Sequence, residues 1–136
     1  MLKIAICDDE RYFQTKIKEI LTNYQEENDI PLSIDIFESG KELLKLEMEL
    51  VRYKIVFLDI KMDEIDGILT ARTIRDINKD IFIVFITAFV DYSLEGYKVD
   101  AIRYILKNNE SFNFTVFESM DAILKKMNYK YSKKYK

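Results

Sequence analysis

Three aspartates follow two short apolar runs of this sequence. Asp8 and Asp9 follow the run 3–7, and Asp59 follows the run 54–58. Runs rich in β-branched residues are typical of parallel strands buried on both faces, and ligands of open α/β sheets bind at the carboxyl ends of such strands. If the two strands are neighbours, the carboxylates repel one another by roughly 4 kcal/mol per pair about 4 Å apart. The pattern therefore predicts a site for a divalent cation, Mg²⁺ or Mn²⁺.

A hydroxyl and an ammonium group follow two further apolar runs. Thr87 closes the run 81–86, and Lys107 closes the run 101–106. Carboxylates, a hydroxyl and an ammonium around a metal are the groups needed to transfer a phosphoryl group to an aspartate. The metal and the lysine neutralise the phosphoryl oxygens, and the hydroxyl donates a hydrogen bond to one of them.

The three aspartates then divide into two roles. Asp59 stands alone at the end of its run, so we expect it to be the nucleophile, and we expect Asp8 and Asp9 to bind the metal. Each position also has an ordinary alternative, such as an acid that solvates a loop, a threonine that caps a turn or a lysine on the surface. Five residues of the required types at the ends of four strands would be a large coincidence.

The elements that must position these residues alternate between strand and helix periodicity. The expected strands are 3–7, 32–36, 54–59, 81–87 and 101–106. The expected helices are 10–26, 40–50, a third helix marked by Ile68, Ala71 and Ile74, 92–97 and 117–127. Arg72 and Arg75 are expected on the solvent side of the third helix. This order predicts an α/β fold: one doubly wound five-stranded parallel sheet with helices on both faces and the flavodoxin-like order 2-1-3-4-5. Its switch point lies between the first and third strands, where the aspartates stand.

Length and composition predict a single soluble domain. We expect the 136 residues to form one unit over 1–127, followed by a basic tail or the start of a linker over 128–136. Cys7 is the one cysteine, so no disulfide forms within the chain and a reducing compartment, the cytoplasm, is expected. The apolar stretch 81–90 is too short to span a bilayer, and the first strand leaves no room for a signal peptide.

The charge is unevenly distributed along the chain. The formal net charge is −3, although residues 125–136 contain six lysines and no acid, so the preceding residues are strongly acidic. An acidic body argues against direct binding of nucleic acid by the domain. The basic tail has two interpretations: an arm for nucleic acid or membrane, or the solvated end of a helix that runs into a linker.

With these motifs, the chain from Met1 to about Met127 resembles the receiver domain of two-component response regulators. The motifs that carry the resemblance are Ile6-Cys7-Asp8-Asp9-Glu10, Phe57-Leu58-Asp59-Ile60-Lys61-Met62 leading to Asp66-Gly67, Ile86-Thr87-Ala88, and Tyr104-Ile105-Leu106-Lys107. The stretch 89–107 is most similar to the branch of receivers whose output is a LytTR-type DNA-binding domain. No such domain is present in these residues.

The resemblance implies a role for each matching position. The implied roles are Asp59 as the phosphorylated residue, Asp9, Asp59 and the backbone carbonyl of Lys61 as metal ligands, Asp8 acting on the metal through water, Thr87 as the switch hydroxyl, Tyr104 as the switch aromatic and Lys107 as the phosphoryl-binding ammonium. The implied partners are a sensor histidine kinase and, after phosphorylation, a second copy of the chain. Contact with DNA would be made through an output domain, and no membrane is involved.

Two positions depart from the family pattern. Asp63 stands where the family usually has proline, which adds negative charge to that loop. Lys107 is followed by Asn108 instead of the usual proline, whose preceding peptide bond is usually cis. Because a cis bond before a non-proline residue costs roughly 3 to 4 kcal/mol, we expect a trans bond here, a changed path for the loop 108–111 and an ammonium still directed at the acids.

The leading hypothesis is a phosphorylation-controlled switch that catalyses only its own phosphorylation and dephosphorylation. The sequence has no histidine, so a phosphohistidine donor must come from a partner kinase. A phosphatase acting on small molecules through an aspartyl-phosphate would typically have an acid two residues after the nucleophile, where this chain has Lys61. A pseudo-receiver that signals by binding alone tends to lose one of the site residues, all of which are present here.

Overall fold

The computed structural model describes residues 1–62, 66–88 and 98–127. Its five parallel strands form one sheet in the order β2-β1-β3-β4-β5. The strands are β1 (Leu2–Cys7), β2 (Leu32–Phe37), β3 (Ile55–Asp59), β4 (Phe82–Thr87) and β5 (Arg103–Leu106). The predicted fold class and strand order are confirmed. The helix expected over 92–97, the tail 128–136 and Asp63 lie outside the described residues.

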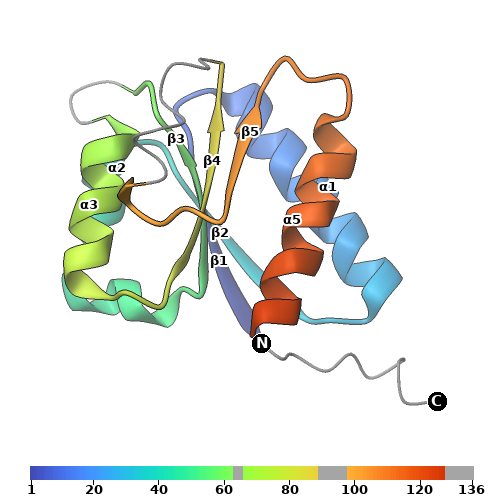
Figure 1. The fold of residues 1–136 in the computed structure, drawn as a ribbon, viewed down its shortest axis with the longest axis horizontal. Coiled ribbons are helices and arrows are strands. Elements are labelled where there is room, and N and C mark those ends of the chain that lie inside the picture. Colours follow the sequence, from blue (N-terminus) through green and yellow to red (C-terminus); the bar gives the residue numbers. More distant parts are fainter. Residues whose placement is uncertain (63–65, 89–97, 128–136) are drawn as a thin grey trace.

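Helices cover both faces of the sheet (Figure 1). One face is covered by α1 (Arg11–Asn28) and α5 (Phe112–Lys126). The other is covered by α2 (Gly40–Leu44), the 3-10 helix η1 (Glu47–Arg52) and α3 (Gly67–Ile77). Within the described ranges, no helix has both the length and the apolar character needed to cross a membrane.

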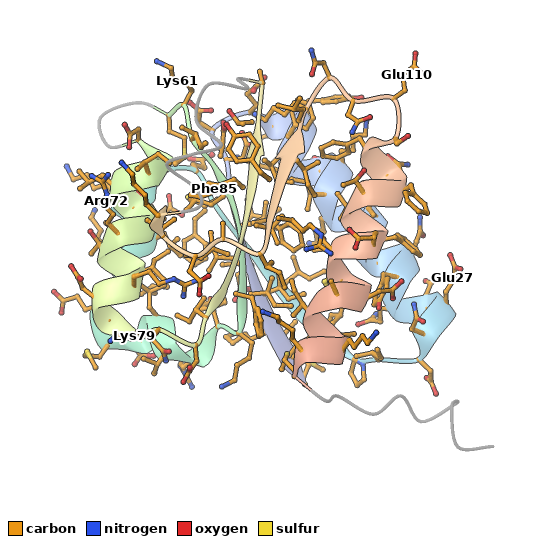
Figure 2. All side chains as sticks on the ribbon, viewed as in Figure 1. Glu27, Lys61, Arg72, Lys79, Phe85 and Glu110 are labelled. Carbon is orange, nitrogen blue, oxygen red and sulfur yellow. The ribbon has the colours of Figure 1, made fainter. Side chains whose placement is uncertain are left out.

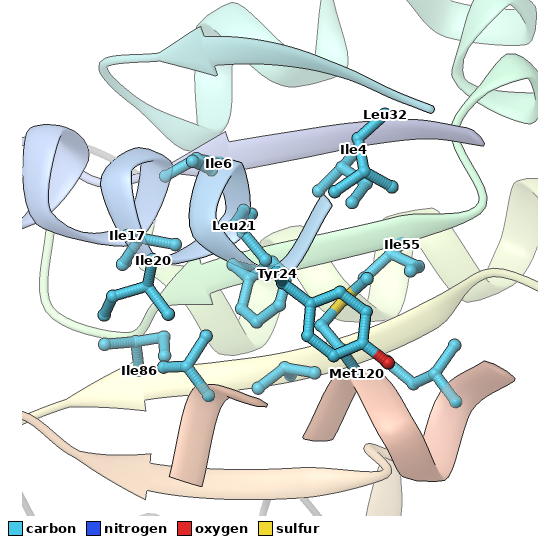
Figure 3. Packing of buried hydrophobic residues seen from close by; sticks show 14 of the residues in the cluster. Ile4, Ile6, Ile17, Ile20, Leu21, Tyr24, Leu32, Ile55, Ile86 and Met120 are labelled. Atoms are coloured by element: carbon cyan, nitrogen blue, oxygen red, sulfur yellow. The ribbon is translucent and has the colours of Figure 1, made fainter. Parts of the chain in front are cut away.

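Successive strand residues belong to two different cores, because side chains alternate between the faces of a sheet. The core under α1 and α5 contains Ile4, Ile6, Ile55, Phe57, Val84, Ile86 and Ile105. Figure 3 shows strand residues of this core packed against Ile17 and Tyr24 of α1 and Met120 of α5. The core under α2 and α3 contains Ala5, Cys7, Val56, Leu58, Ile83 and Phe85. Burial on both faces explains why the strands read as continuous apolar runs.

Two helices differ from their expected ranges. The helix expected over 40–50 is broken into α2 and η1, and Glu47, the first residue of η1, has a φ of 51°, a left-handed conformation that non-glycine residues rarely adopt. The helix expected from Phe117 begins five residues earlier, at Phe112, which is buried. In the segment 112–116, apolar side chains stand at every second residue, a spacing that fits a strand as well as a helix.

Arg75 does not lie on the solvent side of α3 as expected. Its guanidinium donates hydrogen bonds to backbone carbonyl oxygens, those of Val99 (2.7 Å), Lys79 (3.2 Å), Asp100 (3.1 Å) and Ile81. Burial is the main cause of a lowered pKa of this guanidinium. Because the carbonyls belong to the segment after α3 and the segment before β5, this side chain joins two connections of the sheet.

Candidate functional site

The expected site residues meet at the carboxyl edge of the sheet, the upper edge in Figure 1. Cys7 pairs with Leu58, so Asp8 and Asp59 leave neighbouring strands side by side. The backbone N–H of Lys107 donates to the carbonyl of Thr87 at 2.7 Å, which joins the ends of β4 and β5. The strand order therefore brings the ends of β1, β3, β4 and β5 together at one edge, as the sequence predicts.

A single ammonium group binds several acids. Lys107 Nζ lies 3.0 Å from Asp8 Oδ2, 3.1 Å from Asp59 Oδ2 and 2.6 Å from Glu10 Oε1. The side chains of Lys107, Asp8 and Asp59 are buried, whereas that of Glu10 is 56% exposed. The same ammonium lies 4.5 Å from the ring centroid of Phe13, within range of a cation–π interaction. The expectation that Lys107 points at the acidic cluster is confirmed.

The first turn of α1 contributes contacts that sequence reasoning missed. Glu10 is the N-cap residue of α1, and its backbone N–H donates to Asp8 Oδ1 at 2.8 Å. Gln14 Nε2 donates to the backbone carbonyl of Asp8 at 2.7 Å. Glu10, Phe13 and Gln14 are three and four residues apart and share one face of the helix. This spacing, directly after the acidic pair, was the signal available in the sequence.

Burial and repulsion oppose ionisation of the two buried aspartates. Burial, followed by the charge of Asp8, raises the pKa of Asp59 to about 7, although Lys107 acts in the opposite direction. Burial also raises the pKa of Asp8, against the Glu10 N–H and Lys107. Desolvation opposes the charge on Lys107, but the hydrogen bond to Glu10 and the charges of Asp59 and Asp8 outweigh it and raise the pKa of Lys107 to about 12. The site is thus short of positive charge.

The acids are grouped closely enough to bind one cation. Asp8, Asp9, Glu10 and Asp59 each offer a carboxylate oxygen, and these oxygens lie within 4.8 Å of one another. Asp8 Oδ2 is buried and accepts no hydrogen bond from the described residues, although it lies near the Lys107 ammonium. A buried acceptor without a donor, among oxygen ligands of the kind that Mg²⁺ prefers, fits a divalent cation.

The loop after β3 packs closely against the end of that strand. A Cβ on Gly67 would lie 2.0 Å from the carbonyl oxygen of Asp59, so no larger residue fits without a shift of the backbone. The Gly67 N–H donates to the carbonyl of Ile60 at 2.7 Å, and Asp66 caps α3 through its side chain. Lys61 is exposed at the rim of this edge (Figure 2).

Thr87 and Tyr104 belong to β4 and β5, the two strands that follow β3 in the sheet. Thr87 is fully buried at the end of β4, next in sequence to Ile86, which belongs to the α1/α5 core. Tyr104 is half-buried and packs on the α2/α3 core, with its ring centroid 6.2 Å from that of Phe85. Thr87 nevertheless ends its strand beside Asp59 at the carboxyl edge, because Asp59 pairs with Ile86, the residue before Thr87.

The peptide bond after Lys107 is trans, as expected, since the described residues contain no cis peptide. The turn that follows is held by Asn109, whose N–H donates to the carbonyl of Leu106 at 3.2 Å. Its side-chain oxygen accepts the N–H of Ser111 at 2.8 Å, just before α5 begins. That this loop follows a path unlike that of the family stays a prediction.

Comparison with known proteins identifies the same family that the sequence motifs resemble. The family described as response regulator receiver domain matches residues 4–116. The sensory transduction protein LytT of Oceanobacillus iheyensis is 35% identical over 99% of this chain and 53% of its own length. The chain thus spans about half the length of that relative. A relative named LytT agrees with the LytTR-type branch that the motifs resemble.

Solved structures match over nearly the whole chain. The response regulatory domain of MrkE from Klebsiella pneumoniae has a TM-score of 0.81 at 25% identity, covering 95% of this chain and 100% of its own. The response regulator TrrA from Thermotoga maritima, solved in complex with Mg²⁺-BeF, has a TM-score of 0.72 at 32% identity. That match covers 91% of this chain and 100% of the TrrA chain.

Proposed function

The chain belongs to the response regulator receiver domain family, and on this premise we propose that residues 1–127 form a switch controlled by phosphorylation of Asp59. One observation carries the proposal: the buried Asp59 carboxylate ends the central strand 3.1 Å from Lys107, among acids that oppose its ionisation. A buried carboxylate whose ionisation is opposed in this way is more typical of a functional group that binds a cation or accepts a phosphoryl group than of a residue that stabilises the fold.

In the proposed reaction, a phosphohistidine of a sensor histidine kinase is the donor. An oxygen of Asp59 forms a bond to phosphorus as the bond between phosphorus and the kinase imidazole breaks, and the imidazole nitrogen keeps the electron pair. Lys107 neutralises charge on the phosphoryl oxygens. Catalysis by the chain is limited to this transfer and to its own dephosphorylation.

The acidic cluster provides the proposed metal site. Asp9, Asp59 and the backbone carbonyl of Lys61 would hold Mg²⁺ or Mn²⁺, and Asp8 would act through water. A bound cation supplies neutralisation of the charge that develops on the phosphoryl oxygens. The complex of TrrA with Mg²⁺-BeF, at 32% identity, supports this assignment.

Thr87 and Tyr104 would respond to phosphorylation of Asp59. The modification adds a charge of about −1.5 to −2 at Asp59. Thr87 would donate its hydroxyl to the phosphoryl group, and Tyr104 would change its packing in response. A shift from 1:99 to 99:1 between two states requires roughly 5.5 kcal/mol, within reach of a few charge-assisted hydrogen bonds.

The proposed output is a changed contact surface on β5 and α5. There the phosphorylated chain would bind a second copy of itself, and DNA would be bound only through an output domain outside these residues. The length of LytT, of which this chain covers about half, leaves room for an output domain in that relative. Sedimentation with and without beryllofluoride tests the dimer, which an unchanged monomer fraction would contradict.

Intact-mass measurement tests the function. After incubation with Mg²⁺ and a small phosphodonor, we expect the protein to gain the mass of one phosphoryl group. Asp59→Asn is expected to abolish the gain, and Asp35→Asn, a matched change on β2, is expected to retain it. No gain in the wild-type protein would favour the pseudo-receiver, and continuous hydrolysis of small phosphate esters would favour the phosphatase.

A further inference from the structure

The three carboxylates bound to Lys107 differ in how much water they contact. Asp8 and Asp59 have exposed side-chain fractions of 1% and 3%, whereas that of Glu10 is 56%. Glu10 nevertheless makes the shortest of the three contacts, at 2.6 Å. An ammonium group has three N–H donors. Lys107 donates them to Asp8 Oδ1 (3.4 Å), Asp59 Oδ2 (3.1 Å) and Glu10 Oε1 (2.6 Å), so the three acids occupy its full hydrogen-bonding capacity.

We propose that Glu10 competes with the phosphoryl group for the Lys107 ammonium and so restrains phosphorylation of Asp59. The inference rests on the proposed function. A phosphoryl group on Asp59 brings strong acceptor oxygens to the ammonium, so one carboxylate has to give up its donor. Asp8 lies too deep to be released into water without a large cost, whereas Glu10 reaches solvent already.

The negative charge of Glu10 also disfavours phosphorylation of Asp59. The cluster already contains several carboxylates around one ammonium. Each added phosphoryl charge is repelled by Glu10 at short range, and the repulsion is strengthened by the low dielectric of the buried residues beside it. Glu10 therefore disfavours the phosphorylated state both by holding Lys107 and by its own charge.

The Glu10 carboxylate takes no part in the start of α1. The backbone of Glu10 makes the contacts that begin α1: its carbonyl accepts the N–H groups of Phe13 (3.0 Å) and Gln14 (3.1 Å). Its side chain makes no capping hydrogen bond. Replacement of the side chain thus removes the contact with Lys107 and leaves the start of the helix in place. Glu10 is a positioning residue, because it acts on the reaction through Lys107.

The test compares Glu10→Gln with Glu27→Gln, which makes the same change of net charge near the opposite end of α1 (Figure 2). The dissociation constant of beryllofluoride is measured by calorimetry at saturating Mg²⁺. We expect Glu10→Gln to bind the mimic roughly three- to fivefold more tightly than wild type, the range for a half-exposed ion pair. Glu27→Gln is expected to match wild type. A residue that merely supported the fold would weaken binding when replaced.

A crystal structure of the wild-type protein with beryllofluoride gives the second readout. We expect Lys107 Nζ to contact the fluoride and to have left hydrogen-bonding distance of Glu10. Equal or weaker binding by Glu10→Gln, or an intact contact between Lys107 and Glu10 beside the mimic, would overturn the inference.

The two proposals fail in different ways. If wild type binds no beryllofluoride and gains no phosphoryl mass, the proposed function is wrong, and the proposed role of Glu10 is rejected as well. If wild type binds the mimic and Asp59→Asn does not, while Glu10→Gln behaves as wild type, the function stands and only the role of Glu10 is rejected.

Discussion

Two aspartates of the same sheet have opposite pKa shifts. Asp35 lies on the edge strand β2, where Tyr53 Oη donates to it at 2.6 Å and Lys3 binds it at 3.1 Å. The hydrogen bond from Tyr53 is the main cause of a lowered pKa of Asp35. Asp59 ends the central strand β3, and burial with the charge of Asp8 raises its pKa to about 7.

The difference shows which acid stabilises the fold. In the edge network of Lys3, Asp35 and Tyr53, one carboxylate has two donors and remains half-exposed. In the central cluster of Asp8, Asp59, Lys107 and Glu10, three carboxylates share one ammonium, and two of them are buried. The first arrangement lowers the free energy of the ionised state, and the second raises it. Such unfavourable charge is typical of a functional site.

The largest difference in stability between the two regions is expected when Lys107 and Lys3 are replaced one at a time. Lys107→Met leaves buried carboxylates without an ammonium and is expected to lower the free energy of unfolding by about 3 to 5 kcal/mol at neutral pH without metal. Lys3→Met breaks a half-exposed pair and is expected to cost at most about 1 kcal/mol. Urea titrations followed by circular dichroism measure both. Equal losses would show that the two regions do not differ as described.

A backbone contact of the central cluster gives the next effect. Gly67→Ala places a Cβ 2.0 Å from the Asp59 carbonyl oxygen and is expected to cost about 3 kcal/mol, with weakened beryllofluoride binding. Gly40→Ala is the comparison away from Asp59: its Cβ would overlap the buried Thr70 hydroxyl, so it is also expected to lower the free energy of unfolding, but with unchanged beryllofluoride binding. Urea titration and calorimetry measure the two effects. Wild-type affinity in Gly67→Ala would separate Asp59 from this loop.

The pH dependence of stability is expected to have opposite signs for the two aspartates in EDTA. The raised pKa of Asp59 means that the folded state binds more protons between about pH 4 and 7, so stability falls as pH rises, by up to about 1.4 kcal/mol per pH unit. Asp59→Asn removes this fall. The lowered pKa of Asp35 adds stability that is lost as pH falls below about 4. Asp35→Asn removes that loss, and a pH series of urea titrations would contradict the assignment if both variants kept the wild-type profile.

The smallest effect concerns the hydroxyl of Tyr53. Tyr53→Phe removes one hydrogen bond to Asp35 and is expected to lower the free energy of unfolding by about 1 kcal/mol. Beryllofluoride binding is expected to stay unchanged, because the edge network does not contact the central cluster. Urea titration detects the loss, and a change in mimic affinity would reveal coupling between the two regions.

The sheet was predictable because its strands have an unambiguous pattern. Runs such as 82–86 are apolar at every position because α1 and α5 cover one set of side chains and α3 covers the other. The switch point then follows from the strand order, and Asp8, Asp59 and Lys107 meet there. Residue types at strand ends were therefore sufficient to locate the site.

Features that depend on tertiary contacts were not predictable from periodicity. The break between α2 and η1 places Glu47 in a left-handed conformation that no residue type there indicates. The helical spacing of Arg75 predicts a place on the solvent side of α3, but its guanidinium binds backbone carbonyls of Val99 and Asp100, which are distant in sequence. Glu10 belongs to the acidic motif, yet its contact with Lys107 joins residues at opposite ends of the chain.

The interior position of β1 has a consequence for synthesis on the ribosome. β1 lies between β2 and β3, so one of its edges stays unpaired until β3, which comes later in the chain, has been translated. Roughly twenty residues separate the end of β2 from the end of β3, which corresponds to about 1 to 4 s of translation. During that interval the nascent chain presents an apolar strand with an unpaired edge, which is a binding site for chaperones and a risk for association between neighbouring nascent chains.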